Sequence, residues 1–126
     1  MLGWIVLGLV VLLLLYIRFA PSDPKRWHKD IKGEADKNFK GGALRCVECD
    51  LHKLDQIIRD SGARVLAGSV EEGHITYISR TRLIGFPDYT TVQLRGDIIG
   101  IYGRLRFGRS DLAVNRARIE GWLAQL

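Results

Sequence analysis

Hydrophobic residues form one uninterrupted run at the start of the chain, before any alternating or helical period begins. Residues 2–17 are sixteen residues without a charge, which as an α-helix would span roughly 24 Å. Continued past Arg18 to Ala20, the helix reaches about 28 Å, close to the roughly 30 Å hydrocarbon core of a bilayer, with Arg18 extended toward the headgroups. We therefore predict a transmembrane anchor over residues 1–20.

The flanks of this run indicate an uncleaved anchor with the rest of the chain in the cytoplasm. Residues 1–4 contain no basic side chain and Pro21 stands where a signal peptidase would cut, so a cleavable signal peptide is disfavoured. Trp4 and Tyr16, near the two ends, suit the aromatic belts of a membrane interface. Basic side chains lie only on the C-terminal side, which by the positive-inside rule favours a cytoplasmic domain: Arg18, Lys25, Arg26, Lys29 and Lys32.

Residues 21–41 carry many charges and few apolar side chains. Pro21 and Pro24 prevent the helix from continuing, and the stretch that follows to Lys40 has little to bury. We interpret residues 21–41 as a mostly extended juxtamembrane linker, with Trp27 at the membrane interface. Its basic side chains either attract anionic lipid or are simply solvated, and the sequence leaves both interpretations open.

A folded domain over residues 42–126 is predicted from the changes of period that follow. Residues 43–48 form a short apolar strand, Asp50 is a helix N-cap, and helical spacing then continues to a stop at Gly62. From Arg64 onward the period is two, which predicts a hairpin through the turn at residues 71–73 and further strands at residues 89–95 and 98–106.

The last element predicted is a helix after a break at residues 108–109. Ser110 is its expected N-cap, with Asp111 in the first turn. Its apolar stripe is Leu112, Ile119, Trp122, Leu123 and Leu126. The order strand, helix, four strands, helix predicts a two-layer α+β sandwich, in which two helices cover one face of a four- to five-stranded antiparallel sheet and leave the other face open.

The open sheet face is the most distinctive candidate surface. Every basic residue after Lys53 is arginine, and the alternation places several of these beside tyrosine or threonine on that face. A guanidinium is a planar donor fork for phosphate and carboxylate, so the face is a candidate docking surface for lipid headgroups or an acidic protein, with nucleic acid less favoured. A merely solvated face is the competing interpretation. The candidate residues are Arg80, Arg82, Arg95, Tyr102, Arg104 and Arg106.

Length and motifs argue against an elaborate enzyme. The chain has 126 residues and a formal net charge of +5, from 19 basic and 14 acidic residues, which leaves room for one small domain. It contains no glycine-rich phosphate loop, zinc-protease motif or nucleophile elbow, so we predict no catalytic residue and no cofactor.

The chain contains two cysteines, three positions apart. Cys46 and Cys49 have the spacing of half a zinc site or of a redox pair, but no second pair completes a site. We interpret both as structural, with metal binding and redox chemistry as weaker alternatives. Cys49 precedes the predicted N-cap, where the helix dipole would lower its thiol pKa.

The last fifty residues resemble a known family. The sequences around residues 75–82, 85–88, 108–112 and 114–116 resemble the bacterial family called domain of unknown function 1499, and residues 20–28 resemble its membrane-anchored proteobacterial members. Such members have glycine where this chain has Ala113, a change that a helix tolerates well. The motif residues are Phe86, Pro87, Asp88, Arg109, Ser110, Asp111, Leu112, Asn115 and Arg116. Because the family has no settled activity, the resemblance implies an architecture and no reaction.

Two functions follow as expectations. The first is a single-pass, non-catalytic accessory or binding module of the bacterial inner membrane, an auxiliary subunit of a membrane protein complex being one form of it. The alternative is a small ligand-binding or enzymatic domain with a cavity between sheet and helices. The size of the domain favours the first, since little volume remains for a pocket of about 300 Å³ once a core is filled.

Overall fold

The computed structural model describes residues 1–82 and 84–126. In chain order the elements are α1 (Leu2–Phe19), α2 (Pro24–Trp27), β1 (Lys37–Phe39), β2 (Gly42–Val47), α3 (Leu51–Asp60), β3 (Arg64–Ser69), β4 (His74–Arg80), β5 (Pro87–Arg95), β6 (Ile98–Leu105) and α4 (Val114–Leu123). The two that the sequence analysis missed, α2 and β1, both lie within residues 21–41.

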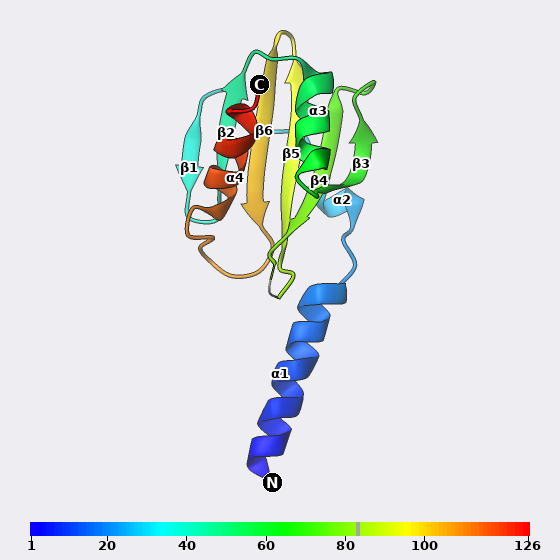
Figure 1. Ribbon diagram of the computed structural model, residues 1–126, viewed down its shortest axis with the longest axis vertical. Helices are drawn as coiled ribbons and strands as arrows, with labels where there is room; N and C mark the ends of the chain where they lie inside the picture. Colours follow the sequence, from blue (N-terminus) through cyan, green and yellow to red (C-terminus); the bar gives the residue numbers. More distant parts are fainter. Residues whose placement is uncertain (83) are drawn as a thin grey trace.

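The strands form one antiparallel sheet in the order β1-β2-β6-β5-β4-β3. Helices α3 and α4 lie on the same face of this sheet (Figure 1). The α+β class with two helices on one sheet face is therefore confirmed. The sheet has six strands and not four or five, because the three-residue β1 pairs with β2 across the turn at residues 40–41.

The main core lies between the two helices and the sheet. Leu54 and Ile58 from α3 are fully buried, as are Ile119 from α4 and Ile101 from β6. Asp50 accepts a hydrogen bond from the His52 N–H at 2.9 Å, as expected of an N-cap. The helical and alternating periods of the sequence therefore specify this side of the sheet.

A glycine in β6 lets α4 approach the sheet closely. A Cβ at Gly103 would lie 3.0 Å from Ile119 Cδ1 and 3.2 Å from Asn115 Oδ1. A larger side chain at this position would push α4 away from the sheet. Gly103 therefore sets where the N-terminal half of α4 sits.

The opposite face of the sheet is covered as well, so our expectation of an open face is wrong. Residues 20–33, which we call the cover segment, run across it. Trp27 stacks on Tyr89 with ring centroids 4.0 Å apart, and Ile31 is only 6% exposed. Gly100 leaves room for this approach, because a Cβ there would lie 3.3 Å from Ile31 Cδ1. Much of the expected linker therefore belongs to the folded domain.

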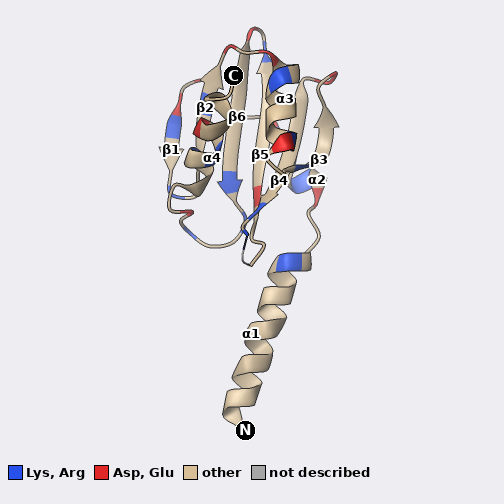
Figure 2. Ribbon diagram, viewed as in Figure 1, with Lys and Arg blue, Asp and Glu red and all other residues tan. Residues whose placement is uncertain are grey.

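Helix α1 projects from one end of the domain (Figure 1). It is long and apolar enough to cross a membrane, by length and composition. Figure 2 shows it without charge except at the end next to the domain, where Arg18 occupies its last turn. Its only buried side chain is Ile17, and the Tyr16 ring contacts Phe107 edge-on at 6.0 Å between centroids.

Candidate functional site

Arg104 is the central polar residue of the covered sheet face. Its guanidinium donates hydrogen bonds to Thr91 Oγ1 at 2.8 Å, to the carbonyl of Tyr102 at 3.1 Å and to the carbonyl of Trp27. Burial lowers the pKa of Arg104 to about 10. Arg104 therefore connects the cover segment to the middle of the sheet and does not face solvent.

Two more of the predicted docking residues hold the same segment. Arg95 donates to the carbonyls of Ile31 at 3.3 Å and Gly33 at 2.7 Å, and Arg106 donates to the carbonyl of Pro21 at 2.9 Å. Arg95 and Arg104 share a sheet face but lie about 20 Å apart along the strands, since Arg104 pairs with Tyr89, about six residues along β5 from Arg95. These arginines satisfy carbonyls that have no strand or helix partner, which explains why the face is not free to dock.

Tyr102 is also occupied inside the protein. Its ring packs edge-on against Phe39 of β1 at 5.7 Å between centroids, and the Arg104 guanidinium lies 4.8 Å from its centre. Of the six predicted docking residues, Arg95, Arg104 and Arg106 are the ones that hydrogen-bond the cover segment, while Arg80 and Arg82 lie at the end of β4 and just beyond it.

A histidine in the middle of the cover segment stacks on a histidine of β4. The rings of His28 and His74 are 3.9 Å apart and nearly parallel. His28 Nδ1 shares a hydrogen bond with Thr76 Oγ1 at 2.7 Å, and His74 Nε2 lies 3.0 Å from the carbonyl oxygen of Lys29. Burial, and then the neighbouring His74, lower the pKa of His28. Nothing in the spacing of these residues predicts the pair.

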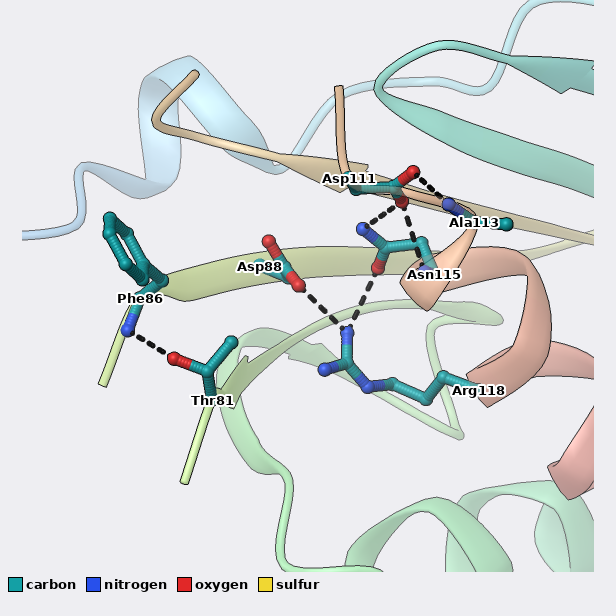
Figure 3. A network of polar contacts seen from close by, with 7 residues as sticks. All are labelled: Thr81, Phe86, Asp88, Asp111, Ala113, Asn115 and Arg118. Atoms are coloured by element: carbon teal, nitrogen blue, oxygen red, sulfur yellow. Dashed lines mark hydrogen bonds and ion pairs between the residues drawn. The ribbon is translucent and has the colours of Figure 1, made fainter. Parts of the chain in front are cut away.

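The family motif forms a polar network around the start of α4 (Figure 3). The carboxylate of Asp111 accepts from the N–H of Ala113 and the N–H of Asn115, each at 3.0 Å, and from the Asn115 side-chain amide at 2.9 Å. Asp111 therefore satisfies the first free N–H groups of the helix. Ser110, our expected N-cap, instead accepts only from the N–H of Leu112 at 3.3 Å.

The network continues from α4 to β5. Arg118 donates to Asn115 Oδ1 at 3.0 Å and to Asp88 Oδ2 at 3.1 Å (Figure 3). Asn115 is fully buried, with both ends of its amide bonded. Burial raises the pKa of Asp88, against the opposing effect of the Arg118 guanidinium. Motif residues from two distant stretches are thereby joined, and the role that fits these contacts is to orient α4.

The turn before α4 has an uncommon backbone. Leu112 and Ala113 adopt left-handed conformations, with φ of 51° and 63°. Our interpretation that alanine at position 113 suits a helix is wrong, because this residue precedes the helix in a conformation that favours glycine. Leu112 is 88% exposed and so does not belong to the apolar stripe of α4.

A small cavity of about 220 Å³ lies beside this turn. Phe86, Asp88, Ser110, Asp111 and Leu112 line it, so the structure brings five motif residues together. The other four motif residues do not line the cavity: Pro87 is buried at the start of β5, Asn115 is buried beneath Asp111, and Arg109 and Arg116 are exposed.

The two cysteines are free thiols, each half-buried. Arg95 lies 3.8 Å from Cys46 Sγ. Burial and the neighbouring Asp50 raise the pKa of Cys49, so the lowering that we expected from the helix dipole is wrong. In residues 1–82 and 84–126, no three His, Cys, Asp or Glu side chains are grouped so that they could hold a metal ion.

A larger cavity, of about 860 Å³, lies where α1 meets the domain. We call it the arginine cavity because Arg18, Arg64, Arg80 and Arg82 all line it. These residues come from the last turn of α1, from β3, from the end of β4 and from the loop after β4. The sequence analysis named Arg80 and Arg82 but could not place them beside Arg18 and Arg64, since these are separated by at least sixteen residues along the chain.

The charges around this cavity are of one sign. Burial, and then the nearby guanidinium of Arg18, lower the pKa of Arg80, with Arg64 and Arg106 acting in the same direction. Among the described residues, no Asp or Glu forms an ion pair with these cavity arginines. The cavity is thus an anion-attracting site with a charged wall on the last turn of the apolar helix.

Comparison with known families identifies the chain's relatives. Residues 17–126 match the family described as "Protein of unknown function (DUF1499)", and the chain belongs to this family. The match includes the cover segment, in agreement with its place in the folded domain. No curated protein and no solved structure matches the chain.

Proposed function

We propose that the protein is a membrane-anchored, non-catalytic binding module in which α1 spans the bilayer. The observation that carries this proposal is that side-chain exposure changes along α1. Every leucine, isoleucine and valine from Leu2 to Leu15 is exposed, whereas Ile17 and Ala20 are buried against the domain. A contiguous apolar surface of this size is rare on a protein surrounded by water, and lipid is the partner that fits a single uncharged helix.

The cover segment makes the attachment rigid. Arg106 donates a hydrogen bond to the carbonyl of Pro21 and Arg95 donates one to the carbonyl of Gly33, while the Ile31 N–H donates to Gln93 Oε1. These bonds fix the segment along the sheet face. A domain held in this way keeps one end toward the bilayer, and the arginine cavity lies at that end beside Arg18. Binding at the membrane surface, to lipid or to a neighbouring membrane protein, is the role that this arrangement supports.

We place the domain on the cytoplasmic side of a bacterial inner membrane. Basic residues follow α1 closely, from Arg18 to Lys32, which is the charge pattern of a helix whose C-terminal end is cytoplasmic. The partners in this proposal are the bilayer and an acidic surface of a membrane protein complex.

A small ligand-binding domain is the second candidate, supported by the cavity beside the motif turn. Asp88 and Asp111 offer polar groups there, next to Phe86 and Leu112. Its volume of about 220 Å³ lies below the roughly 300–1,000 Å³ usual for ligand pockets. The carboxylate of Asp111 already accepts hydrogen bonds from N–H groups at the start of α4, so this candidate ranks second.

Membrane fractionation tests the first proposal. The full chain should stay with the membrane after alkaline carbonate extraction, and its intact mass should include residues 2–19. A chain that lacks residues 1–19 serves as the control and should be released. Recovery of the full chain in the soluble fraction, or a mature mass that lacks the apolar run, would contradict membrane anchoring.

A further inference from the structure

The arginine cavity has the composition of a built anion site. Four guanidinium groups line it together with the hydroxyl-bearing residues Ser22 and Thr81. Its volume of about 860 Å³ falls within the roughly 300–1,000 Å³ of known ligand pockets. A phosphate there could receive bidentate hydrogen bonds from an arginine and single bonds from a hydroxyl.

Within residues 1–82 and 84–126, no carboxylate pairs with the charges of this cavity. Arg80 donates one hydrogen bond to the carbonyl of Gly85 at 2.9 Å, which leaves most of its donors for other partners. Arg18 lies close enough to the same loop that a Cβ on Gly85 would be 2.6 Å from its Cδ. Arg80 is half-buried and the other three arginines are exposed, and an anion bound among them would relieve the repulsion between these like charges.

The position of the cavity indicates what kind of anion it takes. One wall is the last turn of α1, whose apolar side chains continue away from the domain. A ligand with a charged head and apolar chains could place the head among the arginines and the chains along α1. A free inorganic anion would use only the first of these features.

We infer that the arginine cavity binds the phosphate of an anionic phospholipid headgroup, with the acyl chains of that lipid packed along α1. This inference rests on the proposed membrane anchoring and adds a ligand class to it. The phosphate of the bound lipid, which carries one negative charge, would offset part of the positive charge of Arg18, Arg64 and Arg80 and hold the domain at a fixed height above the bilayer.

Native mass spectrometry of the full chain released from nonionic detergent micelles tests the inference. The chain is titrated with phosphatidylglycerol, with phosphatidylcholine of the same acyl chains, and with glycerol 3-phosphate. We expect phosphatidylglycerol to bind at least about tenfold more tightly than either of the others, because phosphatidylcholine brings a quaternary ammonium next to the arginines and glycerol 3-phosphate has no acyl chains to pack along α1. Equal binding of the two lipids would overturn the inference, and so would glycerol 3-phosphate binding as tightly as phosphatidylglycerol.

Single substitutions test whether the lipid binds in the arginine cavity. Arg64 is exposed on the edge strand β3, so Arg64→Gln should leave the fold intact and weaken phosphatidylglycerol binding by about tenfold, while Arg64→Lys should lose less. Arg116 is exposed on α4, and Arg116→Gln is the matched control that should bind as wild type does. Unchanged binding in Arg64→Gln, or an equal loss in Arg116→Gln, would place the lipid elsewhere and refute the site. Carbonate extraction of the same samples reports separately on membrane anchoring.

Discussion

The two faces of the sheet are covered by different chemistry. Helices α3 and α4 cover one face with leucine and isoleucine side chains such as Leu54 and Ile119, which are fully buried. The cover segment is held on the other face mainly by hydrogen bonds of its backbone, whose carbonyls accept from arginine side chains and whose Ile31 N–H donates to Gln93. A helix that packs its apolar side on a sheet needs apolar residues at regular spacing, and this spacing can be recognised in the sequence. An irregular segment held by hydrogen bonds needs no such spacing. This difference explains why one face was predictable and the other was not.

The largest effect is expected on the apolar face. Leu54→Ala should lower the free energy of unfolding by about 2–5 kcal/mol, because Leu54 is fully buried and its removal leaves a cavity. Chemical denaturation measures this change. The exposed neighbour Lys53→Ala is the control, and an equally small effect for both variants would mean that this face is loosely packed.

A smaller but distinct effect is expected on the polar face. Arg104→Met should destabilise the domain by about 1–3 kcal/mol, since it removes the hydrogen bonds that the half-buried guanidinium donates to Thr91 Oγ1 and to the carbonyls of Trp27 and Tyr102. Arg104→Lys should recover only part of this, because an ammonium lacks the planar fork. Chemical denaturation measures this change. If Arg104→Met is as stable as wild type, the cover segment contributes nothing to the stability of the sheet.

The histidine pair makes stability on this face depend on pH. The folded state lowers the pKa of His28, so the unfolded state binds more protons below about pH 6.5, and stability falls as the pH drops through that range. Protonated His28 would face His74 and Arg104, with Glu72 and Asp30 opposing them.

Replacement of His28 separates this effect from the other titrating groups. His28→Phe keeps a ring to stack on His74 and should flatten the loss of stability between about pH 7 and pH 5. His52→Gln, on the exposed side of α3, should keep the wild-type profile. Thermal unfolding across this range decides the matter, and identical profiles for wild type and His28→Phe would rule out the pair as the source.

The smallest effect concerns the turn that leads into α4. Ala113→Gly should raise the free energy of unfolding by about 0.5–1 kcal/mol, because glycine avoids the left-handed strain of about 1–2 kcal/mol at the expense of a more flexible unfolded chain. Ala117→Gly, inside α4, is the control and should lower stability by a similar amount. A loss of stability in Ala113→Gly would mean that the turn is not strained at this residue.

Local signals in the sequence predicted most of the fold and part of the candidate site. The cap at Asp50, the stop at Gly62 and the alternation in β5 and β6 each act over a few residues and were readable. The Trp27–Tyr89 stack depends on contacts across about sixty residues and was not readable. The same is true of the arginine cavity, where Arg18 meets residues of β3 and β4 only after the chain has folded. The conformation of the turn at Leu112 and Ala113 was mispredicted for another reason. Alanine usually forms helices, so nothing in the sequence indicates that Ala113 is left-handed.

Amide hydrogen exchange in the cover segment tests the central claim, that this segment is part of the folded sheet domain. The Ile31 N–H donates to Gln93 Oε1 at 2.7 Å in a buried setting, so in the full chain in detergent micelles its exchange should be at least about tenfold slower than in an unstructured peptide. Gln93→Ala should remove this protection while the amides of β5 and β6 stay protected. Exchange of Ile31 at the unstructured rate in the wild-type chain would contradict the account and return residues 21–41 to the role of a free linker.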